Sequence, residues 1–125
     1  MTLTSIRSEK LSPPVGPFSQ AISTGDLIFL SGQVGLDAGG RLAAGGIEAQ
    51  ARQIFANLSA VLEAAGKTFA DVIRVGVFLT DMGDFAALNA IYAGQFEQPY
   101  PARTTVAVAA LPLGAAVEID LVVKA

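Results

Sequence analysis

The chain has 125 residues, the size of one domain, and 52% of them are hydrophobic while only 15% are charged. Because an average globular sequence has about a quarter charged residues, this composition indicates apolar surface that is buried against partner subunits. The net charge of −3 has the wrong sign for a surface that neutralises several phosphates, which excludes nucleic acid as the default partner.

Residues 1–15 are predicted to form an N-terminal arm of edge strand and loop. The strand is expected at residues 3–7, and the prolines that follow, Pro13, Pro14 and Pro17, preclude regular structure. The N-terminus has no apolar core of the length that a secretory signal requires, and the chain has no apolar run of about 20 residues. We therefore expect a cytoplasmic protein with no membrane partner.

Residues 19–24 and 27–33 are predicted to form a β-hairpin. Gly25 and Asp26 separate the two strands, and a connection of this length that begins with glycine favours a type II′ turn. Glycine pairs at residues 39–40 and 45–46 indicate turns before the next element.

A helix and a central strand are predicted next. From residue 47 to residue 65 apolar side chains recur with the helical period, and Gly66 supplies a C-terminal stop. Residues 72–79 are rich in β-branched side chains and are apolar on both sides of the pleat, which is typical of a strand covered on both faces.

A second helix is expected after a cap at Thr80 or Asp81, and Pro99 and Pro101 end it. Its apolar residues recur with the helical period and are interpreted as core residues. They are Phe85, Leu88, Tyr92 and Phe96.

The last predicted elements are two strands, at residues 103–109 and 116–123, which are expected to pair as an antiparallel hairpin. The order of elements predicts a single α+β domain, residues 1–125, with one mixed β-sheet and two helices packed on one face. The other face would expose apolar residues of the last strands, so we expect a closed oligomer whose sheets pack together.

The absence of histidine and cysteine excludes the most common general base, disulfides and thiolate metal sites. In the expected hairpin, alternation puts Thr105 opposite Glu118 and makes Arg103 a diagonal neighbour of Glu118, close to Asp120. Pattern alone favours an ordinary surface ion pair between Arg103 and Glu118, with no functional meaning. A catalytic pair is the alternative, and the composition leaves it as the leading catalytic option.

Five blocks of sequence stand out in order and spacing. They are Gly-Pro-Phe-Ser-Gln-Ala at 16–21, Phe-Leu-Ser-Gly-Gln at 29–33, Asp-Phe-Ala-Ala-Leu-Asn-Ala-Ile-Tyr at 84–92, Pro-Ala-Arg-Thr-Thr-Val at 101–106 and Val-Glu-Ile-Asp at 117–120. Together these blocks resemble the RidA (YjgF/UK114) family, over nearly the whole chain.

The resemblance implies a chorismate-mutase-like fold, a homotrimer with clefts between its subunits, and 2-iminobutanoate/2-iminopropanoate deaminase activity on small 2-imino acids. Arg103 matches the arginine that binds the substrate carboxylate, and Glu118 matches the glutamate that holds and activates water. Ser31 and Gly32 match positions that line the pocket, Gly32 through its backbone, and Asn89 matches an asparagine beside it. This chemistry needs no metal or cofactor.

Two positions depart from the common family pattern. Phe18 stands where many members have tyrosine, so it can pack against an aliphatic substrate tail but cannot donate a hydrogen bond. It is interpreted either as a pocket residue or as a core or interface aromatic. Thr105 stands where many members have cysteine; it keeps a hydroxyl group but has no thiol chemistry. The two changes leave the choice of substrate open.

Other functions remain as alternatives. The same cleft could bind a keto or amino acid without turnover, as a regulatory module. RNA cleavage or inhibition of translation is an older label of the family, and the pI of about 4.7 and the missing histidines argue against it. A holdase-like interaction protein is a further alternative for so apolar a chain.

Overall fold

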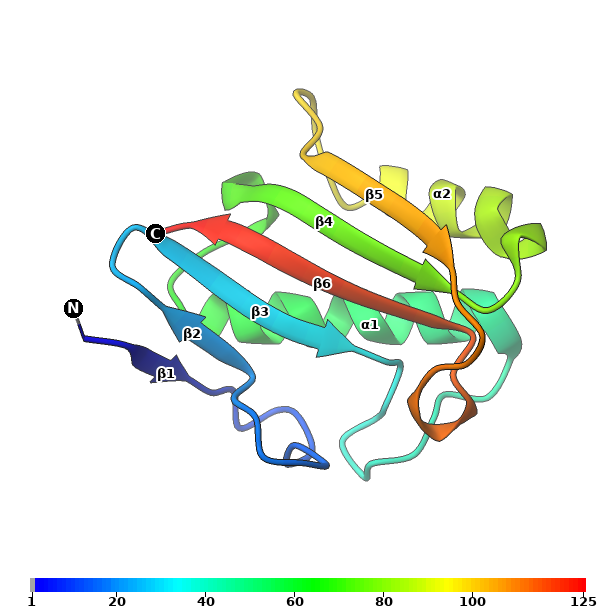
Figure 1. Ribbon diagram of the computed structural model, residues 1–125, viewed down its shortest axis with the longest axis horizontal. Helices are drawn as coiled ribbons and strands as arrows, with labels where there is room; N and C mark the ends of the chain where they lie inside the picture. The colour runs from blue at the N-terminus through cyan, green and yellow to red at the C-terminus, as the bar shows by residue number, and fades with distance from the viewer. Residues whose placement is uncertain (1) are drawn as a thin grey trace.

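In the computed structural model, which describes residues 2–125, the strands form one mixed sheet in the order β1-β2-β3-β6-β4-β5 (Figure 1). The strands are β1 (Thr4–Ile6), β2 (Ala21–Ser23), β3 (Leu27–Gln33), β4 (Val72–Leu79), β5 (Ala102–Ala107) and β6 (Val117–Lys124). The helices are α1 (Gly46–Ala64) and α2 (Phe85–Ala93), with short 3₁₀ turns η1 (Phe69–Asp71), η2 (Met82–Asp84) and η3 (Pro112–Gly114). The predicted α+β class, with one mixed sheet and two helices, is confirmed.

The N-terminal strands follow the prediction. β2 and β3 pair antiparallel, and Gly25 in their turn has a φ of 100°, as the first position of a type II′ turn requires. The arm before β2 is anchored by Gln20, whose side chain accepts a hydrogen bond from the Ser8 N–H (2.7 Å) and donates one to the Ser8 carbonyl (3.3 Å).

α1 forms where the apolar period predicts it. It ends at Ala64, and Gly66 follows its C-cap with a φ of 72°, which lets the next N–H, that of Lys67, reach the Leu62 carbonyl at 2.8 Å.

α2 begins as expected but ends at Ala93 with Gly94 as its C-cap, so Phe96 lies beyond the helix and Pro99 and Pro101 do not end it. Before α2, the Asp81 carboxylate accepts a hydrogen bond from the Gly83 N–H at 2.8 Å and caps η2. Asp81, rather than Thr80, is therefore the residue that caps this segment.

The predicted hairpin between the last two strands is wrong. β4 lies between β5 and β6; it pairs parallel with β5 and antiparallel with β6. The reason is α2, which returns the chain to the starting end of β4, so β5 runs in the same direction as β4. The connection to β6 then crosses the end of β4, where the Val108 N–H donates to the Leu79 carbonyl at 2.8 Å.

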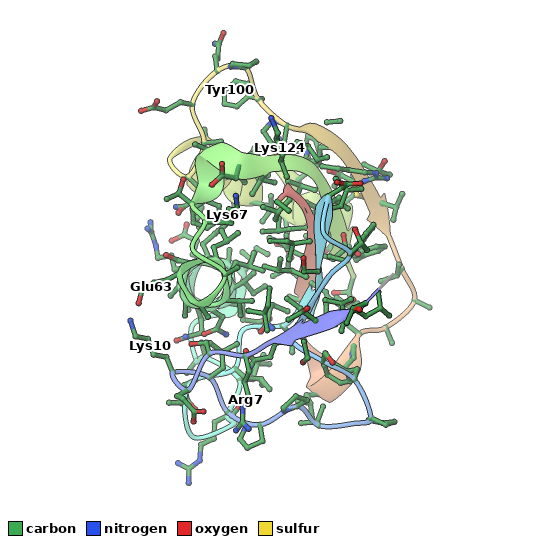
Figure 2. All side chains as sticks on the ribbon, turned by 90° about the vertical axis from the view of Figure 1, so that its left-hand side faces the viewer. Arg7, Lys10, Glu63, Lys67, Tyr100 and Lys124 are labelled. Carbon is green, nitrogen blue, oxygen red and sulfur yellow. The ribbon has the colours of Figure 1, made fainter. Side chains whose placement is uncertain are left out.

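The two helices cover one face of the sheet, as predicted. Figure 2 shows α1 end-on at one side of the strands. On that side lie the fully buried residues of β4 and β6, packed against those of α1 and α2. Among them are Val75, Val77 and Leu79 of β4 and Ile119 and Leu121 of β6.

The opposite, helix-free face carries the other alternating set of side chains. It is apolar in large part: Phe29 is 46% exposed and Val106 is 39% exposed. Phe78 is half-buried and lies beside Glu118. β4 was expected to be covered on both faces. Within residues 2–125, the helices cover one face of β4, and the helix-free face is not covered. No helix in that part of the chain is long and apolar enough to cross a membrane.

Candidate functional site

Glu118 lies on the helix-free side of β6, beside a bulge in β3. The register between β3 and β6 shifts between Leu30 and Gln33, because an advance of three residues along β3 corresponds to an advance of only two along β6. Ser31 and Gly32 form this interval. A Cβ atom at Gly32 would lie only 2.9 Å from Glu118 Cδ. Because glycine has no side chain, the space above this position is free for the Glu118 carboxylate.

Ser31 fixes the bulge to the segment before β2. Its hydroxyl donates a hydrogen bond to the Ser19 carbonyl at 2.6 Å, and its N–H donates to the Gln20 carbonyl at 2.9 Å. The same segment carries Phe18, whose side chain is 47% exposed. Phe18, Ser31, Gly32 and Glu118 all line one pocket.

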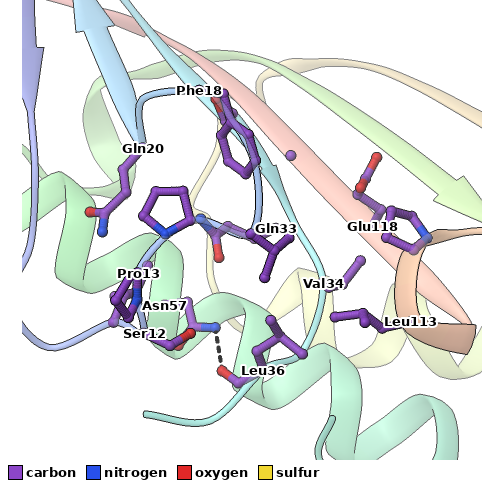
Figure 3. Close-up of a pocket in the computed structure, with 16 residues that line it drawn as sticks. Ser12, Pro13, Phe18, Gln20, Gln33, Val34, Leu36, Asn57, Leu113 and Glu118 are labelled. Atoms are coloured by element: carbon purple, nitrogen blue, oxygen red, sulfur yellow. Dashed lines mark hydrogen bonds between the residues drawn. The ribbon is translucent and has the colours of Figure 1, made fainter. Parts of the chain in front are cut away.

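This pocket has a volume of about 310 Å³. Its wall is mostly apolar and comes from residues 11–15 of the arm, the connection after β3, and η3. In the view of Figure 3, Phe18 and Glu118 lie above it and Leu36 and Asn57 lie below. The Asn57 side chain is already engaged, since it donates a hydrogen bond to the Leu36 carbonyl at 2.9 Å. Glu118 is therefore the ionisable group of a largely apolar cavity.

The environment of Glu118 favours a basic carboxylate. Burial, and in addition the negative charge of Asp120, raise the pKa of Glu118 above its ordinary value. Burial also raises the pKa of Asp120, against the lowering effects of the Gly76 N–H hydrogen bond and of Arg74. A carboxylate with a raised pKa accepts a proton from water more readily than an exposed one.

Arg103 lies elsewhere, in a second cluster. It pairs in register with Val75 of β4, whose side chain is buried under the helices, so Arg103 is on the helix-covered side at the sheet edge. Its guanidinium carbon is 4.6 Å from the ring centroid of Tyr92 and 5.6 Å from that of Phe85. Within residues 2–125 it has no ion-pair partner.

Three buried polar atoms without hydrogen-bond partners within residues 2–125 lie on the same two elements as this cluster. Thr105 follows Arg103 on the same side of β5, and Asn89 shares one face of α2 with Phe85 and Tyr92. Asn89 Oδ1, Thr105 Oγ1 and Tyr92 Oη are buried and have no hydrogen-bond partner in the described part of the chain. Burial raises the pKa of Tyr92, and the charge of Arg103 offsets part of that effect. Buried side-chain polar atoms normally have hydrogen-bond partners, so these three atoms are exceptions.

The structure thus groups the predicted site residues into two half-sites. The glutamate half-site contains Phe18, Ser31, Gly32 and Glu118; the arginine half-site contains Asn89, Arg103 and Thr105, with Phe85 and Tyr92. The expected contact of Arg103 and Thr105 with Glu118 inside one chain is wrong, because β4 separates the strands and the two half-sites lie on opposite faces.

Sequence reasoning missed several contributors to these half-sites, among them Phe85, which the apolar period assigns to the core and which contacts Arg103. In the sequence, only the glycine indicates the bulge at residues 31–32. Nothing in the sequence indicates the role of Gln50. Its side-chain Oε1 accepts a hydrogen bond from the Ala116 N–H at 2.8 Å and so anchors the connection that carries Leu113 to the pocket. Tyr92 was interpreted as core because it follows the apolar period. It is buried, but its ring also contacts Arg103.

Comparison with known proteins covers nearly the whole chain. The family model described as Endoribonuclease L-PSP matches residues 9–125. The 2-iminobutanoate/2-iminopropanoate deaminase of Dermatophagoides farinae is 42% identical over 120 residues, 94% of each chain. RidA from an Antarctic Psychrobacter species has a TM-score of 0.93 at 42% identity, covering 98% of this chain and 99% of its own. E. coli TdcF with bound serine has a TM-score of 0.91 at 32% identity, covering 98% of both chains. On these matches, the chain belongs to the RidA family.

Proposed function

We propose that this protein hydrolyses reactive 2-imino acids, such as 2-iminobutanoate and 2-iminopropanoate, to 2-keto acids and ammonia. Curated relatives named for this deaminase activity support it at the level of the family. The observation that carries the proposal is the division of the site: Arg103 has no anionic partner, and Glu118 has no cationic partner, within residues 2–125. A substrate with a carboxylate and an electrophilic carbon complements both.

The two half-sites meet only if they belong to different protomers. A homotrimer in which Arg103 of one protomer faces Glu118 of its neighbour would form three equivalent clefts. It would also supply partners or substrate for the unpartnered atoms of Asn89 and Thr105. The apolar helix-free face supports such an assembly, because monomers seldom expose so large an apolar surface.

The chemistry follows from these groups. Arg103 binds the substrate carboxylate with two parallel hydrogen bonds, which fixes the imine carbon in the cleft. Glu118 orients a water molecule and takes one of its protons as the water oxygen bonds to the carbon of the protonated imine, which gives a tetrahedral carbinolamine. Glu118 then returns that proton to the amino nitrogen. As the C–N bond breaks and ammonia leaves, Glu118 takes the hydroxyl proton, and the carbonyl forms. Phe18 and the apolar pocket receive the aliphatic tail.

The test is ammonia release from 2-iminobutanoate that threonine dehydratase generates in the same vessel. The wild type is expected to accelerate release above the uncatalysed rate. Arg103→Ala should lose about 2 to 5 kcal/mol of transition-state stabilisation, and Glu118→Gln should lose about 10²- to 10⁴-fold in rate. The matched control is Arg52→Ala, which removes an exposed arginine of α1. An uncatalysed rate in wild type, or full activity in Arg103→Ala, would contradict the proposal.

A second function is favoured by one comparison. E. coli TdcF, whose structure resembles this chain, is described with bound serine, which carries the same carboxylate handle. The cleft could therefore bind a keto or amino acid as a regulatory module without turnover. Calorimetric binding of 2-ketobutanoate or serine, together with no imine hydrolysis, would favour this function over the first.

A further inference from the structure

The rings of Phe85 and Tyr92, here called the aromatic seat, both lie against the Arg103 guanidinium. The distances of 4.6 Å to Tyr92 and 5.6 Å to Phe85 are within the range of about 6 Å for a cation–π contact. We propose that the aromatic seat positions Arg103 for binding a substrate carboxylate. This inference rests on the role of Arg103 in the proposed function, and it makes Tyr92 and Phe85 positioning residues.

An arginine that binds a substrate carboxylate must keep its N–H donors unoccupied before the substrate arrives. A protein carboxylate beside Arg103 would occupy the N–H donors that the substrate needs, and none pairs with it within residues 2–125. Aromatic rings attract the charge through their own π faces, and they engage none of the five N–H donors in a conventional hydrogen bond. The aromatic seat therefore restrains Arg103 and leaves its donors free for a two-pronged contact.

The seat is itself attached to the hydrophobic core. The Tyr92 ring lies 4.6 Å from that of Phe96 and 6.2 Å from that of Phe55, centroid to centroid, and Tyr92 is only 7% exposed. Phe85 is 36% exposed and completes the seat from the start of α2. An arginine restrained before binding loses less side-chain entropy when the ligand arrives, so affinity rises without a new contact to the ligand.

The hydroxyl group of Tyr92 separates this role from other roles. It is buried and makes no hydrogen bond in the described part of the chain. If the ring positions Arg103, then Tyr92→Phe keeps the function and Tyr92→Leu loses it. If the hydroxyl contacts the substrate or a neighbouring subunit, then both variants lose it.

The experiment measures the Kd for 2-ketobutanoate by calorimetry, and kcat and KM in the imine assay. Tyr92→Leu is expected to raise Kd and KM about tenfold, and Phe85→Leu about threefold, with kcat little changed. Tyr92→Phe should remain within about twofold of wild type. The matched control, Phe69→Leu, removes a ring of the same core cluster that packs on Phe55 and Phe96 and is not in contact with Arg103.

A double-mutant cycle with Arg103→Gln tests whether the effect passes through Arg103. Glutamine carries no charge for the rings to attract, so Tyr92→Leu should change Kd less than about twofold in the Arg103→Gln background. The same cycle can be measured with Phe85→Leu. Because Phe85 lies at the surface, this variant still tests the inference if Tyr92→Leu fails to fold.

Three results would overturn the inference: equal losses in Tyr92→Phe and Tyr92→Leu, unchanged Kd in Phe85→Leu, or the same penalty in both backgrounds of the cycle. A wild type that binds 2-ketobutanoate but does not hydrolyse imines would reject the proposed function and leave the seat to be judged on Kd. A wild type that hydrolyses imines with an unaffected Phe85→Leu variant would reject the seat alone. A wild type that does neither rejects both.

Discussion

Two carboxylates, Glu118 and Asp120, share the helix-free side of β6 and lean in opposite directions. Glu118 lies over Gly32 of β3, and Asp120 lies over Gly76 of β4, where an added Cβ would collide with it. Asp120 is near enough to raise the pKa of Glu118, after burial, which is the larger cause. At the residue scale, the basicity of Glu118 thus depends on its neighbour two positions along the same strand.

The pH dependence of Asp120→Asn follows from that neighbour. A general base works only when it is ionised, so activity falls as the pH drops through the pKa of Glu118. Removal of the Asp120 charge lowers that pKa towards its ordinary value, so the acid limb of the kcat/KM profile should move to lower pH. Glu48→Gln, which neutralises an exposed carboxylate in the first turn of α1, should leave the limb in place. An unmoved limb in Asp120→Asn would contradict the coupling.

At the scale of elements, the contact between β3 and β6 positions the proposed base. The bulge in β3 brings Gly32 under Glu118, and bulges commonly redirect side chains beside active sites. The position tolerates no side chain unless Glu118 moves, because its Cγ, Cδ and Oε2 would all lie within 3.1 Å of an added Cβ.

Gly32→Ala is therefore expected to displace the Glu118 carboxylate and lower kcat by about a hundredfold, the usual cost of a misplacement of about 1 Å. Steady-state kinetics measures the loss, and circular dichroism should report an intact fold. Gly94→Ala is the matched control: φ is −76° there, and an added Cβ would meet only the Ile91 carbonyl at 3.5 Å. Full activity in Gly32→Ala would show that the contact does not position Glu118.

At the scale of the whole molecule, the two half-sites lie on opposite faces of one sheet. A single chain cannot bring them together, because β4 and its helix cover lie between them. The helix-free face offers a surface for assembly, with Phe29 and Val106 exposed and Arg74 and Asp120 among them. Activity and assembly are therefore expected to depend on each other.

Phe29→Asp places a charge on the helix-free face and should break the proposed homotrimer. Light scattering is expected to give about three times the chain mass of 12.8 kDa for wild type. The variant should give the monomer mass, with its circular dichroism retained and imine hydrolysis lost. Ala56→Asp adds the same charge to an exposed position of α1 and should leave the trimer intact. A monomeric wild type, or an active monomeric variant, would contradict the composite cleft.

Most of the local structure, and the family, follow from the sequence alone. α1, the start of α2, the β2–β3 hairpin and the Gly66 stop were predictable, because periodicity and capping depend on residues close together in the chain. The sequence left the cap open between Thr80 and Asp81 and placed the end of α2 too late. The family blocks also identified Arg103 and Glu118 as the residues to examine.

The arrangement of those residues depends on the pairing of strands that are distant in the chain. Alternation shows which side chains of a strand share a face, but it does not show which strand is its neighbour. The crossover through α2 made β5 parallel to β4 and left the other edge of β4 to β6. This pairing separates Arg103 from Glu118. Arg103 belongs to the set of β5 side chains that faces the helices, whereas Glu118 belongs to the set of β6 side chains on the opposite face.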